Sequence, residues 1–227
     1  MNNRAIRKLP CGYCGFQSNP RKVEHVFSKT LFKSQQVIIP NDPIKIPSCS
    51  SCEGIKNKLE NYVAIIMNLS SGKDLGDAHI RGGIRTFSPQ QRSLLFNGER
   101  RDIKINGLYQ DMWVGGVDYT SIEKLLEYIG MGIVYYHTEK PGIKRQYPNR
   151  IVAAMPVSSE RDTALMFNAI NISSPQHIFL DKGRYNNEIK YAAVISTTKA
   201  IVHVQIFNPM FSNSKEICRT FAITLTQ

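Results

Sequence analysis

Four cysteines are the residues in this sequence with the clearest chemistry. They form two Cys-x-x-Cys pairs, Cys11 with Cys14 and Cys49 with Cys52. Each pair can place two thiolates on one tight turn, and two such turns close a tetrahedral zinc site. The alternatives are two disulfides, which need an oxidising compartment, or a redox motif, which normally occurs once. The repeated spacing therefore predicts a structural zinc ion held by all four cysteines.

The segments that follow the cysteine pairs contain acidic, imidazole and amide groups. Residues 21–27, Arg-Lys-Val-Glu-His-Val-Phe, have the composition of a short strand that carries Glu24 and His25. After Cys52, apolar residues recur at helical spacing from Ile55 to Ile66, which predicts an amphipathic helix. A different face of that helix carries Glu53, Asn57 and Glu60.

The order of these elements resembles that of the HNH endonucleases, whose core is the ββα-metal fold. The frequent family pattern is Cys-x-x-Cys, an acid followed by His, and a second Cys-x-x-Cys followed by Asn-x-x-Lys. In this sequence Glu24-His25 and Glu53-Gly-Ile-Lys56 stand in the two places outside the cysteine pairs. The resemblance covers residues 9–68 and depends on the joint order of the four elements.

The resemblance implies a phosphodiesterase with one catalytic metal ion. His25 matches the general base of the family, and Glu24 matches a ligand of the catalytic metal. Glu53 stands where the family usually has its second ligand, Asn, and Asn57 one turn later could supply an amide ligand. The catalytic ion would be Mg²⁺ or Mn²⁺, in addition to the structural zinc.

The residue types suit this chemistry. A neutral His, with an unperturbed pKa of roughly 6.5, can take a proton from water at neutral pH. A hard cation held by carboxylates polarises a phosphoryl oxygen. Neighbouring strand residues point to opposite faces, so a bend must bring Glu24 and His25 into one cleft. For contacts to phosphate, the candidates are Arg21, Lys22 and Lys56.

The charge of the chain is strongly positive and uneven. The formal net charge is +11, and residues 1–100 carry 15 Lys and Arg against 7 Asp and Glu. A basic N-terminal part of the chain favours a polyanionic partner, with DNA as the leading candidate and RNA as the alternative. Simple solubility is the other explanation for such a charge.

The composition indicates a globular protein. The hydrophobic fraction of 42% and the charged fraction of 21% are close to globular averages, which argues against a disordered or fibrous chain. No apolar run approaches the length of a membrane span, and no secretory signal is evident at the N-terminus. We therefore expect a cytoplasmic protein without a membrane partner, and the resemblance suggests a bacterial or phage-encoded one.

The second half of the chain has a different pattern. Thr120–Glu123 has the sequence of a capping box, and the apolar stripe after it predicts a helix that ends before Pro141. A shorter helix is expected at residues 159–169. Strands are expected at residues 103–108, 151–157, 190–197, 200–207 and 219–226, with a turn at Thr198-Lys199.

These elements predict an α+β fold with a mainly antiparallel sheet in the second half. We expect a ββα-metal module with structural zinc at residues 1–70, a linker at 71–84 and an α+β accessory domain at 85–227. The predicted function is metal-dependent endonucleolytic hydrolysis of DNA, and a homodimer is left open. One alternative is a non-catalytic zinc-knuckle protein that binds nucleic acid. The other is a nuclease effector or toxin of phage defence that a partner or ligand must release.

Overall fold

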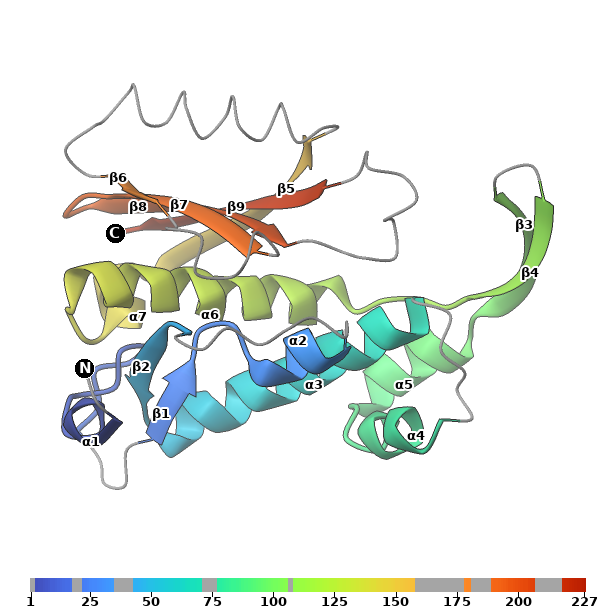
Figure 1. Ribbon diagram of the computed structural model, residues 1–227, viewed down its shortest axis with the longest axis horizontal. Helices are drawn as coiled ribbons and strands as arrows, with labels where there is room; N and C mark the ends of the chain where they lie inside the picture. The colour runs from blue at the N-terminus through green and yellow to red at the C-terminus, as the bar shows by residue number, and fades with distance from the viewer. Residues whose placement is uncertain are drawn as a thin grey trace.

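Helix α6 (Tyr119–Thr138) lies at the centre of the fold, between an N-terminal layer and a C-terminal sheet (Figure 1). The predicted α+β class with antiparallel sheets is confirmed. The structure is a computed structural model, and it describes residues 3–17, 22–34, 43–70, 77–105, 108–157, 178–180, 189–206 and 218–227. The helix predicted at 159–169 lies outside these residues.

The N-terminal layer consists of a short hairpin and the long helix that follows it. Its elements are α1 (Asn3–Ile6), β1 (Lys22–His25), α2 (Lys29–Ser34), β2 (Lys45–Ser48) and α3 (Ser50–Ser70). The strand predicted around Glu24 and the helix predicted after Cys52 are both confirmed. β1 and β2 pair antiparallel, with Glu24 opposite Ile46 and His25 opposite Lys45.

Two short helices and a projecting hairpin connect this layer to α6. They are α4 (Ala78–Ile84), α5 (Pro89–Phe96), β3 (Glu99–Ile105) and β4 (Leu108–Val114). Part of the predicted linker is thus helical, because Ile80 of α4 is buried in an apolar cluster with Tyr62 of α3 and Phe87. The strand expected at 103–108 contains the end of β3 and the first residue of β4, which pair antiparallel.

The central helix α6 packs closely on both of its sides. Its N-cap is Asp118, whose side chain accepts a hydrogen bond from the backbone of Ser121, so the helix begins slightly before the predicted capping box. A Cβ atom on Gly130 would lie 2.7 Å from Ile223 of the sheet, and one on Gly132 would lie 2.7 Å from Val26, just after β1. The two glycines therefore let the sheet and the hairpin layer approach α6 closely.

The C-terminal sheet is antiparallel throughout, with the strand order β5-β9-β8-β7-β6. Its strands are β5 (Asn149–Val157), β6 (Ile178–Leu180), β7 (Ile189–Ile195), β8 (Lys199–Ile206) and β9 (Cys218–Thr226), and the short helix α7 (Ile143–Gln146) precedes them. The predicted hairpin between β7 and β8 is confirmed, but its turn lies at Thr197-Thr198, one residue before the predicted position, because the amide of Ser196 donates to the carbonyl of Lys199, the first residue of β8.

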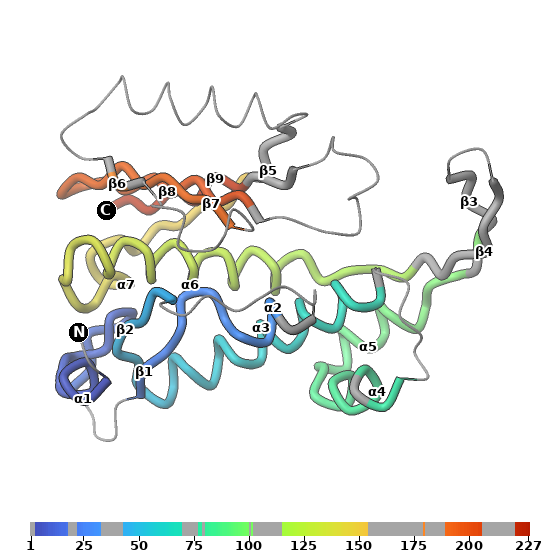
Figure 2. Tube along the Cα trace, in the orientation of Figure 1, coloured from blue at the N-terminus to red at the C-terminus, as the bar shows by residue number. Residues whose placement is uncertain are grey.

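One apolar core joins the layers. Its buried members extend from Cys11 in the first cysteine pair through Ile129 of α6 to Leu225 in the last strand. Figure 2 shows the same stacking, with the blue N-terminal segments and the red C-terminal strands on opposite sides of α6. Among the described helices, none has the length and apolar character needed to cross a membrane.

Candidate active site and metal centre

The four predicted zinc ligands come together in the fold. The sulfur atoms of Cys11, Cys14, Cys49 and Cys52 all lie within 4.8 Å of one another, and the Sγ atoms of Cys14 and Cys49 are 3.6 Å apart. All four are free thiols. Zn–S bonds of about 2.3 Å in a tetrahedron place the sulfurs about 3.8 Å apart, so the cluster has the ligand type and spacing to hold a zinc ion.

Local backbone geometry builds the two cysteine turns. The first turn closes through a hydrogen bond from the Gly15 amide to the Cys11 carbonyl, and Gly15 has a positive φ of 76° that favours glycine. The second pair spans the end of β2 and the first turn of α3. The Gly12 amide donates to the Pro47 carbonyl at 2.9 Å, which joins the first turn to β2 and so to the second pair.

The thiols influence one another's ionisation. A hydrogen bond from Cys52 is the main reason that the pKa of Cys11 falls to about 4. The same contact raises the pKa of Cys52, with burial as the second cause. A divalent cation favours the thiolate form of every ligand, because its positive charge stabilises the negative charge on the sulfur atoms.

His25 lies at the end of β1, half-buried and surrounded by positive charge. Burial lowers its pKa most, and Lys29, Lys45 and Lys56 lower it further. Lys45 is its cross-strand neighbour, and Lys29 begins α2. The imidazole is therefore neutral at neutral pH, and lysine ammonium groups lie around it.

Glu24 faces the interior on the other side of β1. Its side chain is buried, and Lys56 Nζ lies 3.0 Å from Glu24 Oε1. Lys56 is fully buried, donates to the His25 carbonyl at 2.9 Å, and also forms an ion pair with Glu60. Burial raises the pKa of both carboxyl groups, although the Lys56 charge acts in the opposite direction. Lys56 thus has no exposed surface for a phosphate, which differs from its predicted use.

This buried triad of Glu24, Lys56 and Glu60 gives a stability prediction. Lys56→Met should lower the free energy of unfolding by about 3–5 kcal/mol, because it leaves two buried carboxylates without their cation. Urea unfolding of Lys56→Met and of the control Lys58→Met, which changes an exposed lysine of the same helix, measures the difference. Equal unfolding midpoints for the two variants would show that the triad contributes little.

Glu53 is the second predicted metal ligand, and it lies in the first turn of α3. Its carboxylate forms an ion pair with Lys22 at 2.9 Å, and Lys22 is largely exposed. Glu53 also contributes to the raised pKa of Glu24, as the smallest of five causes, so the two carboxylates interact electrostatically. Asn57 is exposed one helical turn later. Arg21 lies outside the described residues.

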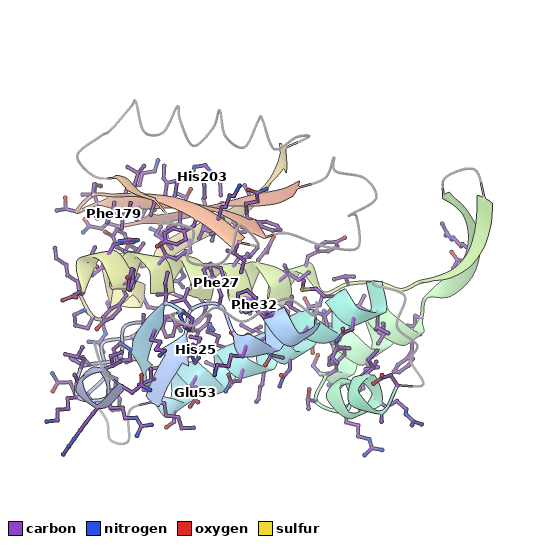
Figure 3. All side chains as sticks on the ribbon, in the orientation of Figure 1. His25, Phe27, Phe32, Glu53, Phe179 and His203 are labelled. Carbon is purple, nitrogen blue, oxygen red and sulfur yellow. The ribbon has the colours of Figure 1, made fainter. Side chains whose placement is uncertain are left out.

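Glu24, His25 and Glu53 do not form a cluster of metal-ligand side chains like that of the cysteines. Over the described residues, the four cysteines are the one group of three or more His, Cys, Asp or Glu side chains close enough to hold an ion. Strand alternation separates Glu24 from His25, and the charges that shift the pKa of His25 all belong to lysines. Figure 3 shows His25 and Glu53 projecting from β1 and from the start of α3.

Sequence reasoning missed several residues of this region. Lys29 and Lys45 belong to the surroundings of His25, and the ion pair of Glu60 with Lys56 was not predicted although Glu60 was placed on the helix. This ion pair could have been predicted, since Lys56 and Glu60 have the i,i+4 spacing of a helical ion pair. The approach of Lys45 to His25 depends on the register of β1 and β2, which the sequence does not reveal.

Comparisons of the chain with protein-family models, with curated proteins and with solved structures find no match. The functional assignment therefore depends on the residues of the site.

Proposed function

We propose that this protein is an HNH-type endonuclease that hydrolyses phosphodiester bonds in DNA, with RNA as the alternative substrate. The observation that carries the proposal is His25, a half-buried imidazole that lies opposite Lys45 in the hairpin and shortly before Lys29 at the start of α2. It lies on a hairpin that leads directly into the cysteine cluster and helix α3. This arrangement combines a base with a positively charged surface.

The neutral imidazole is suited to take a proton from an attacking water molecule. The ammonium groups of Lys29 and Lys45 attract a phosphate and offset the negative charge that develops on it during attack. Because Lys29 is exposed and Lys45 is partly exposed, both can meet a substrate at the surface. In this proposal they replace Lys56 as the residues that contact phosphate.

The proposal includes a catalytic Mg²⁺ or Mn²⁺ held by Glu24, Glu53 and Asn57. Carboxylate and amide oxygens are the ligands that such hard cations prefer, and the ion would supply Lewis-acid polarisation of the phosphate. As they lie, Glu24 forms an ion pair with Lys56 and Glu53 forms one with Lys22, so each carboxylate already has a lysine ammonium as its partner. Hydrolysis in this proposal therefore depends first on His25 and the lysines, and metal dependence is tested separately.

The test is nicking of supercoiled plasmid by the purified protein in Mg²⁺, in Mn²⁺ and in EDTA, with zinc content measured in parallel. Single-stranded RNA serves as the second substrate. Cleavage that appears with a divalent ion and disappears in EDTA supports the full proposal. Cleavage that persists in EDTA would remove the catalytic metal from it, and absence of cleavage in every condition would contradict it.

Glu53→Asn should keep or raise the cleavage activity if residue 53 is a metal ligand. The change restores the usual residue of the family at this place and frees Lys22 from its ion pair. The loss of a pair with a largely exposed lysine should change stability little. Rates of plasmid nicking against Mg²⁺ concentration give the measurement, with Glu53→Ala as the matched variant that should lose activity. Complete inactivity of Glu53→Asn would indicate another role for Glu53.

The second candidate is a zinc-stabilised protein that binds nucleic acid without cutting it. The ion pairs of Glu24 with Lys56 and of Glu53 with Lys22 favour this candidate, because they neutralise both carboxylates internally. Gel-shift assays separate the two candidates. Binding that depends on Lys29 and Lys45, together with no nicking in any metal ion, would favour the binder.

A further inference from the structure

Lys144 lies beside the cysteine cluster although it belongs to the C-terminal half of the chain. Its Nζ atom is 4.0 Å from Cys52 Sγ and donates to the hydroxyl of Tyr128 at 2.5 Å. The same ammonium lies 4.3 Å from the centroid of the Tyr128 ring. Lys144 is in α7 and Tyr128 is in α6, so the contact joins two elements to a cluster formed far away in the sequence.

The backbone holds Lys144 in this position. Its own amide donates to the Tyr13 carbonyl at 2.8 Å, and the amides of Gly142 and Ile143 donate to the Gly12 carbonyl at 3.0 and 3.1 Å. These carbonyls belong to the first cysteine turn. Gly15 also lies so close to Gly142 that a Cβ atom on it would be 3.2 Å from Gly142 Cα. The start of α7 is therefore attached to the turn that carries Cys11 and Cys14.

A cation beside the cluster is electrostatically favourable. Four thiolates around one Zn²⁺ leave the centre with a net negative charge. Three of the cysteines are buried, so water screens this charge poorly. Lys144 is half-buried, and its ammonium lies 4.0 Å from the sulfur of Cys52, where its charge attracts a thiolate. Tyr128 is itself buried and fixes the ammonium through its hydroxyl and its ring.

We propose that Lys144 lies in the outer coordination sphere of the zinc centre, where its ammonium group raises zinc affinity by compensating the negative charge of the thiolates. The zinc centre is then completed by the C-terminal half of the chain, because α6 and α7 supply its neighbouring cation. This proposal concerns metal binding alone, and it holds or fails independently of the proposed endonuclease activity.

Zinc affinity of four variants tests the proposal. Lys144→Met and Lys144→Gln remove the charge, Lys144→Arg keeps it, and Lys140→Met changes an exposed lysine just before α7 as the control. Competition with a chelator gives the zinc dissociation constant, and the spectrum of the Co²⁺-substituted protein reports thiolate coordination. Mutation of a residue in the outer coordination sphere of a metal site typically lowers metal affinity by about 10–100-fold. We expect a loss of this size for Lys144→Met and Lys144→Gln, and near wild-type affinity for Lys144→Arg and Lys140→Met.

The result that overturns the proposal is wild-type zinc affinity in a folded protein with a neutral residue at position 144. A loss in Lys144→Arg as large as that in Lys144→Met would also overturn it, because charge would then not be the cause. Circular dichroism of the zinc-loaded proteins establishes that each variant is folded. If Lys144→Met does not fold, Lys144→Gln decides the outcome, because it keeps a hydrogen-bond donor for Tyr128.

Discussion

Replacing His25 with alanine should abolish plasmid cleavage in Mg²⁺ or Mn²⁺ while leaving the protein folded. Removal of a general base typically costs roughly 10²–10⁴-fold in rate, and in a nicking assay such a loss leaves no detectable product. The fold should survive because the hydrogen bond between residue 25 and the buried Lys56 uses the backbone of residue 25 and not its imidazole. Its carbonyl accepts the hydrogen bond from Lys56, and alanine keeps that carbonyl.

The structure offers a matched control for this variant. His203 is also a half-buried histidine whose pKa is lowered by burial, but it lies in β8 of the C-terminal sheet. His203→Ala should therefore leave the nicking rate unchanged. Time courses of both variants, with circular dichroism and zinc content alongside, separate lost chemistry from lost structure. Unchanged cutting by His25→Ala would remove the assignment of His25 as the base.

Replacing Cys49 with serine should release zinc and collapse the N-terminal layer. Cys49 is buried where β2 leads into α3, and its sulfur is 3.6 Å from that of Cys14. A serine hydroxyl is a poor ligand for zinc, and structural zinc contributes its binding free energy directly to folding, about 10–16 kcal/mol in small zinc-finger peptides. Because Cys49 belongs to the same apolar core as α6 and the sheet, the loss should lower the stability of the whole chain.

Zinc content and thermal unfolding measure this effect. Ser51→Ala is the control, since it changes an exposed side chain in the same turn without removing a sulfur. We expect zinc content and melting temperature close to wild type for Ser51→Ala, and a large fall in both for Cys49→Ser. A Cys49→Ser protein with full zinc content and unchanged stability would argue against a site of four thiolates.

The features that the sequence predicted well are those that depend on residues close together in the chain. The two cysteine pairs predicted one cluster, and the sulfurs do meet. The apolar period after Cys52 predicted α3, alternation predicted the strand at 200–207, and the strand-like run at 219–226 predicted the last strand. In each case the periodicity of a helix or strand, or the ligand preference of zinc, is a local property.

The predicted bounds of elements were wrong where two residues could cap the same helix or where two strands had to pair. Asp118 caps α6 before the expected capping box, because its carboxylate reaches the amide of Ser121. The expected strand at 103–108 includes parts of two strands that form a hairpin. Within the segment that was expected to be a linker, residues 78–84 form a helix whose Ile80 and Ile84 are buried in a cluster with Tyr62 and Ile65 of α3, a contact that their spacing alone does not reveal.

The environment of the candidate site was decided by tertiary packing. Local spacing identified Glu24, His25 and Glu53 as chemical groups, but it did not show that Lys56 is buried between two carboxylates. Nor did it show that Lys144 lies beside Cys52. The energy of a charged group depends on its burial and on charges from other segments, and these exist only after the hairpin, α3 and α6 have packed together. The local sequence therefore determines which reactive groups are present, whereas their charge states and their partners are determined by the contacts between distant elements.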